Sequence, residues 1–320
     1  MTIRTRKTIT PTRKLFEPIE LNIELETIVL LQQFEQDQQK SGKAEETIRS
    51  RMQALKQVAR LCNLNDSEAV KTWLADKDKC KWNNKTKTKF CDTYTAFLNY
   101  KGAKWQPPKY TITEKLPFIP TEQEIDLLIS GTGKVTSTVL QTLKETGMRI
   151  GELTQLKWIN IDTERKTVNI TPEKGSNPRI LPISDKLLAM INKLPKNRPT
   201  IFQPHKHMLR DYFCTQRKKI AEKLQNPRLQ SITFHTFRHW KGTMEYHATK
   251  DIMHVKAILG HKDIDATMIY INLEQALWLQ NTDNFTCKVA HDEKEEAELI
   301  EAGFEHVNNR QNLAFYRKRK

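Results

Sequence analysis

The segment FHTFRHW, residues 234–240, holds two histidines four residues apart with an arginine between them. On a helix, residues at this spacing share a face, so His235 and His239 could bind one zinc ion. With Arg238 they could instead bind a phosphate, since a guanidinium group makes two parallel hydrogen bonds to phosphate oxygens. A third interpretation is plainer, because a single histidine is more often a structural residue than a ligand.

The metal interpretation is the weakest in this segment. It lacks the glutamate of an H-E-x-x-H zinc motif, and no third ligand follows at a recognisable spacing. A guanidinium group also keeps its proton, which makes Arg238 a poor neighbour for a divalent cation. The segment therefore favours an anion site, in which His235 donates a hydrogen bond or accepts a proton.

Three other segments carry residues of the same chemical kind. In ILGHKDIDATMIY, Tyr270 lies nine residues after His261, on an expected helix that can fold back toward the histidine. In TGMRIGELT, Arg149 lies at an expected helix start, where free backbone N–H groups favour anions, and Glu152 is spaced to orient it. In EKGSNPRILPI, Lys174 occupies the tip of an expected β-hairpin. Each residue alone has a plainer explanation, such as a core tyrosine or a solvated lysine.

Together and in this order, the four segments resemble the tyrosine recombinase (integrase) family. The resemblance covers most of the chain, and RHWKGTMEYHATKDIMHVKAILGHKD and LIEAGFEHV look most like archaeal members. One departure is Trp240, which stands where a small hydroxyl residue is common. Carried over position by position, the catalytic set is Arg149, Lys174, His235, Arg238, His261 and Tyr270, with Glu152 and His239 in support.

The resemblance implies a transesterification on DNA that needs neither a metal nor another cofactor. Tyr270 would attack a backbone phosphate, giving a 3′-phosphotyrosyl bond and a free 5′-hydroxyl, so that rejoining needs no ATP. His235 would act as the base, and Lys174 would protonate the leaving oxygen. The two arginines would clamp the phosphate, and His261 would add a hydrogen bond.

The family implies a site-specific recombinase, most simply the integrase of a virus, plasmid or other mobile element. Its partner would be double-stranded DNA, bound as a dimer per site and a tetramer in the synapse, in the host cytoplasm at the nucleoid. Two enzymes with the same chemistry stay open: a Xer-like recombinase that resolves chromosome dimers and a type IB topoisomerase. A non-catalytic DNA-binding protein of this fold is a further alternative, although it has no need for both Lys174 and Tyr270. A metallonuclease would lose its activity in a chelator.

The charge balance also favours a nucleic-acid partner. Lysine and arginine number 53 against 38 aspartates and glutamates, a formal net charge of +15. The run DKDKCKWNNKTKTKFC interleaves lysines with Trp82 and Phe90, which favours a DNA-facing strip over a merely solvated face. The residues expected to contact DNA are Lys77, Lys79, Lys81, Lys85, Lys87, Lys89 and, in the hairpin, Arg179.

Composition excludes two other classes. The five cysteines form no C-x-x-C pair, which favours a reducing interior over secretion. No apolar run approaches the roughly 20 residues of a membrane span. The opening MTIRTRKTITPTRK has no apolar segment behind its basic residues, so it predicts a basic arm instead of a signal peptide.

Apolar periodicity predicts a mainly α protein of the α+β class with a small β-hairpin or sheet. Helices are expected over about 23–34, 48–61 and 83–100, and another after an N-cap at Ser67. In the second half, Thr121 should cap a helix, Gly147 should end another, and Val168, Ile170, Ile180 and Ile183 should flank the hairpin turn. The expected parts are a basic arm (1–20), a helical core-binding domain (21–104), a Pro-containing linker (105–119), a catalytic domain (120–282) and a strand–helix–strand–strand tail (283–320).

Overall fold

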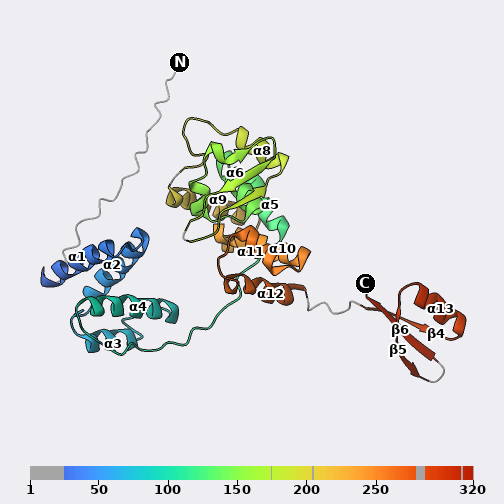
Figure 1. Cartoon of the computed structure of the whole chain (residues 1–320), viewed down its shortest axis with the longest axis horizontal. Coiled ribbons are helices and arrows are strands. Elements are labelled where there is room, and N and C mark those ends of the chain that lie inside the picture. Colours follow the sequence, from blue (N-terminus) through green and yellow to red (C-terminus); the bar gives the residue numbers. More distant parts are fainter. Residues whose placement is uncertain (1–24, 174, 204, 279–284, 311–312, 320) are drawn as a thin grey trace, which may run out of the picture. The chain divides into compact units, whose positions relative to one another are not determined.

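The structure, a computed structural model, describes residues 25–173, 175–203, 205–278, 285–310 and 313–319. The chain divides into two compact units, Met1–Glu114 and Lys115–Lys320 (Figure 1). This division lies inside the segment 105–119, where the prolines predict a linker. The described residues are mainly helical and include two small antiparallel sheets, which confirms the expected fold class. The basic arm lies outside the described residues.

Four helices form the first unit: α1 (Leu25–Lys40), α2 (Glu45–Ala59), α3 (Ser67–Ala75) and α4 (Asn84–Tyr100). The cap of α3 differs from the prediction, because the Asp66 side chain accepts hydrogen bonds from the amides of Glu68 and Ala69, and Ser67 is the first helical residue. Asp66 is the better acceptor because its carboxylate is charged and lies at the positive end of the helix dipole.

The aromatic residues of the lysine-rich run belong to the core of this unit. Phe90 is buried, and the Trp82 ring lies 5.4 Å from it and 5.0 Å from the Trp73 ring. Trp105 also packs here, 4.7 Å from the Tyr94 ring, and its indole N–H donates to a threonine hydroxyl of α4 at 2.9 Å. Trp82 and Phe90 therefore stabilise the helices, and residues past the expected boundary at 104, Trp105 and Tyr110, also pack against this core.

The second unit contains a three-stranded sheet, whose inward residues share one hydrophobic core with the helices. The Thr121 capping box begins its first helix, and Gly147, at φ 59°, ends the second in the left-handed conformation that glycine tolerates best. The strands are β1 (Ile161–Asp162), β2 (Thr167–Ile170) and β3 (Arg179–Pro182), antiparallel in the order β1-β2-β3. The helices are α5 (Glu122–Gly131), α6 (Lys134–Thr146), α7 (Ile150–Thr154), α8 (Asp185–Asn192), α9 (Lys206–Lys223), α10 (Phe234–Thr249), α11 (Ile252–Leu259) and α12 (Asp265–Trp278).

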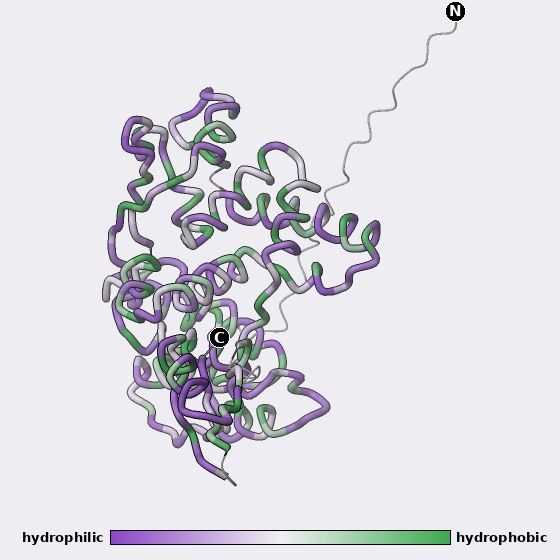
Figure 2. Tube along the Cα trace, turned by 90° about the vertical axis from the view of Figure 1, so that its right-hand side faces the viewer, coloured by the Kyte–Doolittle hydropathy of each residue, from purple (hydrophilic) through white to green (hydrophobic). Residues whose placement is uncertain are grey.

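The expected tail is present as β4 (Phe285–Ala290), α13 (Glu293–Glu301), β5 (Glu305–Arg310) and β6 (Leu313–Arg319). The strands form an antiparallel sheet in the order β4-β6-β5, and α13 packs on it through a small core that includes Leu299 and Tyr316 (Figure 1). Hydrophobic and hydrophilic residues alternate along the helices (Figure 2), and none of the described helices is long and apolar enough to cross a membrane.

Candidate active site

Helix α10 carries three of the candidate residues on its first two turns. It begins after Thr233, whose hydroxyl accepts a hydrogen bond from the amide of Thr236 at 3.3 Å. The rings of His235 and His239 lie 4.5 Å apart at 84°, so the two histidines do share a face. Among the described residues, however, no group of three or more His, Cys, Asp or Glu is placed to hold a metal ion.

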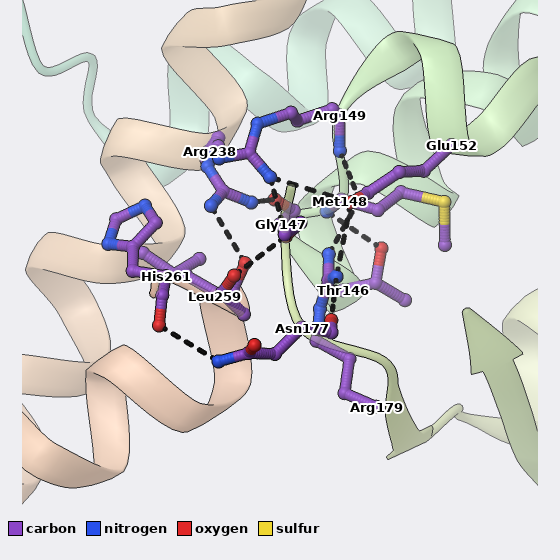
Figure 3. Close-up of polar contacts among 12 residues, drawn as sticks. Thr146, Gly147, Met148, Arg149, Glu152, Asn177, Arg179, Arg238, Leu259 and His261 are labelled. Atoms are coloured by element: carbon purple, nitrogen blue, oxygen red, sulfur yellow. Dashed lines mark hydrogen bonds and ion pairs between the residues drawn. The ribbon is translucent and has the colours of Figure 1, made fainter. Parts of the chain in front are cut away.

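Arg238 is fixed between the ends of two other helices. Its side chain is buried, and its two terminal nitrogens donate to the carbonyl oxygens of Gly147, at 2.9 Å, and Leu259, at 2.7 Å (Figure 3). A guanidinium group has five N–H donors, so these two bonds set its position without exhausting its capacity to bind an anion. Burial, together with the charge of Arg149, lowers the pKa of Arg238 to about 10, so it stays cationic at neutral pH.

Arg149 lies beside Arg238 in Figure 3 and is the N-cap residue of α7. Its Nη1 donates to the hydroxyl of Ser176 at 2.7 Å, and that hydroxyl donates in turn to the carbonyl of Gly260 at 2.7 Å. The Arg149 side chain is 28% exposed, so solvent reaches it. Two cations held side by side, one buried and one accessible, are an arrangement that can bind an anion without first rearranging.

Arg179 is almost fully buried, and the expectation that it contacts DNA is wrong. It occupies an inward position of β3, where its side chain is 4% exposed and donates to both carboxylate oxygens of Glu152, at 2.7 and 3.2 Å. Glu152 also accepts the backbone amide of Arg149 at 2.9 Å. Burial alone would raise the pKa of Glu152, but the bonds from Arg179 and from the Arg149 amide outweigh it and lower that pKa. The buried ion pair thus fixes the backbone position of Arg149 through the Glu152 carboxylate.

His261 follows a glycine that no other residue replaces easily. Gly260 has φ 68°, and a Cβ there would lie 2.8 Å from both Arg179 Nη1 and the carbonyl of Asn177. The buried His261 ring makes a 2.8 Å hydrogen bond from Nδ1 to the hydroxyl of Thr267. Burial, and then the charge of Arg238, lowers the pKa of His261 to about 3, so the ring is neutral at pH 7.

Tyr270 is buried against α10, near both His239 and His261. Its ring is nearly parallel to that of His261, at 6.5 Å, and 6.2 Å from that of His239. It lies directly on Gly242, where a Cβ would come within 2.5 Å of the tyrosine Cζ. Burial raises the pKa of Tyr270 to about 12, although the charges of Arg238 and Arg149 oppose the rise. The hydroxyl is therefore protonated at neutral pH and needs a base to become a nucleophile.

His235, the residue expected to act as that base, is neutral. Its side chain is exposed, and partial desolvation followed by the charges of Arg238 and Arg149 lowers its pKa, which leaves it neutral and able to accept a proton. Of the six expected catalytic residues, the structure brings five together. The sixth, Lys174, lies outside the described residues.

Sequence reasoning missed Ser176, Asn177, Thr267 and Gly242, all of which hold other site residues. Asn177 donates through Nδ2 to the carbonyl of His261 at 3.2 Å and through its amide to the carbonyl of Gly260 at 3.0 Å. Ser176 and Asn177 fall in a cluster of residues typical of turns, so nothing in that segment separates a site residue from an ordinary turn residue.

The lysines expected to contact DNA divide into two groups. Lys87 is buried, donates to the carbonyl of Leu74 at 2.5 Å and lies over the ring of Tyr110, so the expectation that it contacts DNA is wrong. Lysine is long enough for its ammonium group to reach a partner inside a small helical unit. The exposed lysine set consists of Lys77, Lys79, Lys81, Lys85 and Lys89.

Comparison with known proteins places the site in a family. Residues 121–276, which include all six expected catalytic residues, match the phage integrase family. These residues are a phage integrase domain. The tyrosine recombinase XerA of Pyrococcus horikoshii is 27% identical over 179 residues, which cover 54% of this chain and 62% of XerA. The match to XerA thus spans less than two thirds of that relative.

Solved integrase structures share the fold. The Tn1549 transposon integrase in complex with transposon right end DNA aligns with a TM-score of 0.61 and 17% identity, over 86% of this chain and 99% of that chain. A lambda integrase tetramer bound to a Holliday junction aligns with a TM-score of 0.57 and 15% identity, over 76% of each chain. Within this domain, Trp240 lies in the main core and Arg179 pairs with Glu152.

Proposed function

We propose that this protein is a tyrosine site-specific DNA recombinase that cuts and rejoins strands through a 3′-phosphotyrosyl intermediate. The observation that carries the proposal is the convergence of Arg149, Arg238 and His261 on the side of α10 where Tyr270 is buried. A binding protein would need the cations but not a tyrosine placed against them.

Each side chain has one part in the proposed reaction. The Tyr270 oxygen forms a bond to phosphorus and passes its proton to His235, while the bond to the 5′-oxygen breaks. Lys174 gives that oxygen a proton, a role that follows from the family resemblance. Arg149 and Arg238 stabilise the charge on the non-bridging oxygens, and a comparable donor contributes about 3–4 kcal/mol. The same steps in reverse rejoin the strand to a 5′-hydroxyl.

The substrate in this proposal is double-stranded DNA. Supporting it are the net charge of +15 and the exposed lysine set on the first unit, whose side chains would neutralise phosphates. We propose a dimer on each site and a tetramer in the synapse, acting in the host cytoplasm at the nucleoid. The lambda integrase that aligns with this chain was solved as a tetramer on a Holliday junction.

The biological role proposed is integration or excision of a mobile element. Resolution of chromosome dimers, the role of a Xer-like recombinase, is the second candidate, and the similarity to XerA favours it. The two differ in their DNA sites, since a resolvase acts on two copies of one chromosomal sequence and an integrase on one element site and one host site.

The test begins with a site selected by the protein itself. The Tyr270→Phe variant captures duplexes from a random pool. The captured sequence is then made as a set of duplexes, each with one nick at a different position. Cleavage just upstream of a nick releases a short strand that diffuses away, so the covalent adduct accumulates. Wild-type protein in EDTA should become covalently joined to a 3′ end, and Tyr270→Phe should bind equally well without joining. Wild-type binding without an adduct would support the non-catalytic alternative, and cleavage that EDTA abolishes would support a metallonuclease.

A further inference from the structure

The helix that carries Tyr270 is joined to α10 at a second place, beyond the tyrosine. Glu274 is buried, and its Oε1 accepts hydrogen bonds from the ammonium group of Lys250 and, at 3.3 Å, from Nδ1 of His247. The His247 ring also stacks on Trp278, with centroids 3.9 Å apart and planes at 18°. We call Lys250, His247, Glu274 and Trp278 the clamp.

The backbone conformation at Lys250 is one that usually favours glycine over a residue with a side chain. Lys250 ends α10 with φ 54°, a left-handed conformation that costs free energy for any residue with a Cβ. Helices α6 and α11 end in the same conformation with Gly147 and Gly260, the residue type that usually occupies this position. At 250 the chain has a lysine instead, and its ammonium group reaches the buried carboxylate of Glu274.

The apolar packing of α12 is limited to one small cluster. Tyr270 and Leu273 lie in it with Val255 and Leu259, and it meets the main core through the partly buried Ile119 and Ile258. A polar anchor beyond the tyrosine therefore adds a second constraint on the rotation and axial position of the helix. The hydrogen bond from Lys250 lowers the pKa of Glu274, so the carboxylate is ionised at neutral pH and both donors meet a full negative charge.

We propose that Glu274, held by Lys250 and His247, is a positioning residue that sets the rotation and register of α12 so that Tyr270 faces Arg238 and His261. Residues four apart lie on the same face of a helix, so an anchor at 274 fixes the direction in which 270 projects. The inference rests on the proposed function, because it assigns the clamp to a reaction of Tyr270.

The test compares two glycine substitutions that have the same effect on the backbone. Lys250→Gly removes the clamp cation and relieves a left-handed residue, and Gln225→Gly relieves another, at φ 51°, that has no part in the clamp. Gln225→Gly should unfold at or above the wild-type urea midpoint, whereas in Lys250→Gly the relieved backbone should offset part of the stability lost with the hydrogen bond, so that the domain is fully folded at the assay temperature. Lys250→Gly should slow single-turnover cleavage of the nicked duplex about tenfold, the size expected for one charge-assisted hydrogen bond, at unchanged DNA affinity. Gln225→Gly should cleave at the wild-type rate.

Two more variants separate positioning from stability. Lys250→Arg should restore most of the cleavage rate, because it keeps a cationic donor, and Glu274→Gln should lose the rate as Lys250→Gly does. Wild-type cleavage by both Lys250→Gly and Glu274→Gln would overturn the inference, and so would a loss of cleavage that is accounted for by a smaller folded fraction at the assay temperature. A wild-type protein that forms no adduct would overturn the proposed function, and the clamp inference with it.

Discussion

The buried pair of Arg179 and Glu152 allows a sharp prediction, because the lysine and arginine content alone would place Arg179 on DNA. The Arg179→Met substitution keeps the length of the side chain and removes its charge. Glu152, whose side chain has no exposed surface, would then keep only the Arg149 amide at 2.9 Å and a long contact to the Arg149 side chain at 3.5 Å. Removing one partner of a buried pair typically costs about 3–5 kcal/mol.

The free energy of unfolding should therefore fall by about 3–5 kcal/mol in Arg179→Met. Urea unfolding is measured by hydrogen exchange in peptides from residues 121–276, so that the first unit does not contribute to the signal. The control is the double variant Arg179→Met with Glu152→Gln, which removes the stranded charge and should recover part of the loss. The stability of Arg179→Lys should lie between those of Arg179→Met and the wild type, because an ammonium group cannot bind both carboxylate oxygens in parallel.

DNA binding provides the opposing measurement. If Arg179 contacted a phosphate, its loss would lower the slope of log Kd against log salt concentration by about 1. The buried pair predicts an unchanged slope, measured at a temperature where the variant is folded. Stability within about 1 kcal/mol of wild type together with a lower slope would refute the structural role, since a loss that small is below the range for a broken buried pair.

Three other predictions concern the site and the DNA surface. Gly242→Ala should displace the Tyr270 ring, because the new Cβ would lie 2.5 Å from its Cζ. Adduct formation should then fall while DNA affinity is unchanged. Adduct formation equal to that of wild type would mean that the ring does not rest on Gly242 during cleavage. His261 has a pKa of about 3 in the folded protein, whereas in the unfolded chain it binds a proton near pH 6.5. The free energy of unfolding should therefore fall as the pH drops from about 6.5 toward 4. His261→Gln should reduce this pH dependence, and an unchanged pH dependence would show that His261 does not contribute to it. Replacing the exposed lysine set with glutamine should weaken DNA binding and flatten its salt dependence, whereas Lys87→Gln should lower stability and leave the salt slope unchanged; the reverse pattern would contradict the burial of Lys87.

Local signals predicted much of the second unit. Thr121 with Glu124 predicts a helix start, Gly147 a helix end, and the apolar residues on either side of the turn a hairpin, because each depends on neighbours in the sequence. The hairpin register was less predictable. Ile180, whose apolar character marks the second strand, is 64% exposed, while Leu181 faces inward.

That one-residue difference explains the error at Arg179. Side chains alternate along a strand, so inward Leu181 places Arg179 on the inward face as well. Its partner Glu152 is 27 residues away in the sequence, and no local pattern links the two. Lys87 is similar, since its acceptor lies on another helix. Composition shows that a chain is basic, but the contacts of each cation depend on the tertiary structure.

The catalytic set was predictable through the resemblance to tyrosine recombinases. His235 and Arg238 lie on α10 and Tyr270 on α12, nine residues after His261, and the structure brings these side chains together. The residues that orient them, Ser176 and Thr267, were not predictable, because serine and threonine hydroxyls in turns and helix starts have many ordinary uses.

The central claim is that Tyr270 carries the DNA during the reaction. The adduct formed on the nicked duplex is digested with nuclease and trypsin, and the masses of the peptides are measured by mass spectrometry. The tryptic peptide 263–288 contains Tyr270 and no other tyrosine, so a nucleotide on this peptide identifies the residue. The account predicts a 3′-nucleotide joined through phosphate to Tyr270. A nucleotide on any other peptide would contradict it.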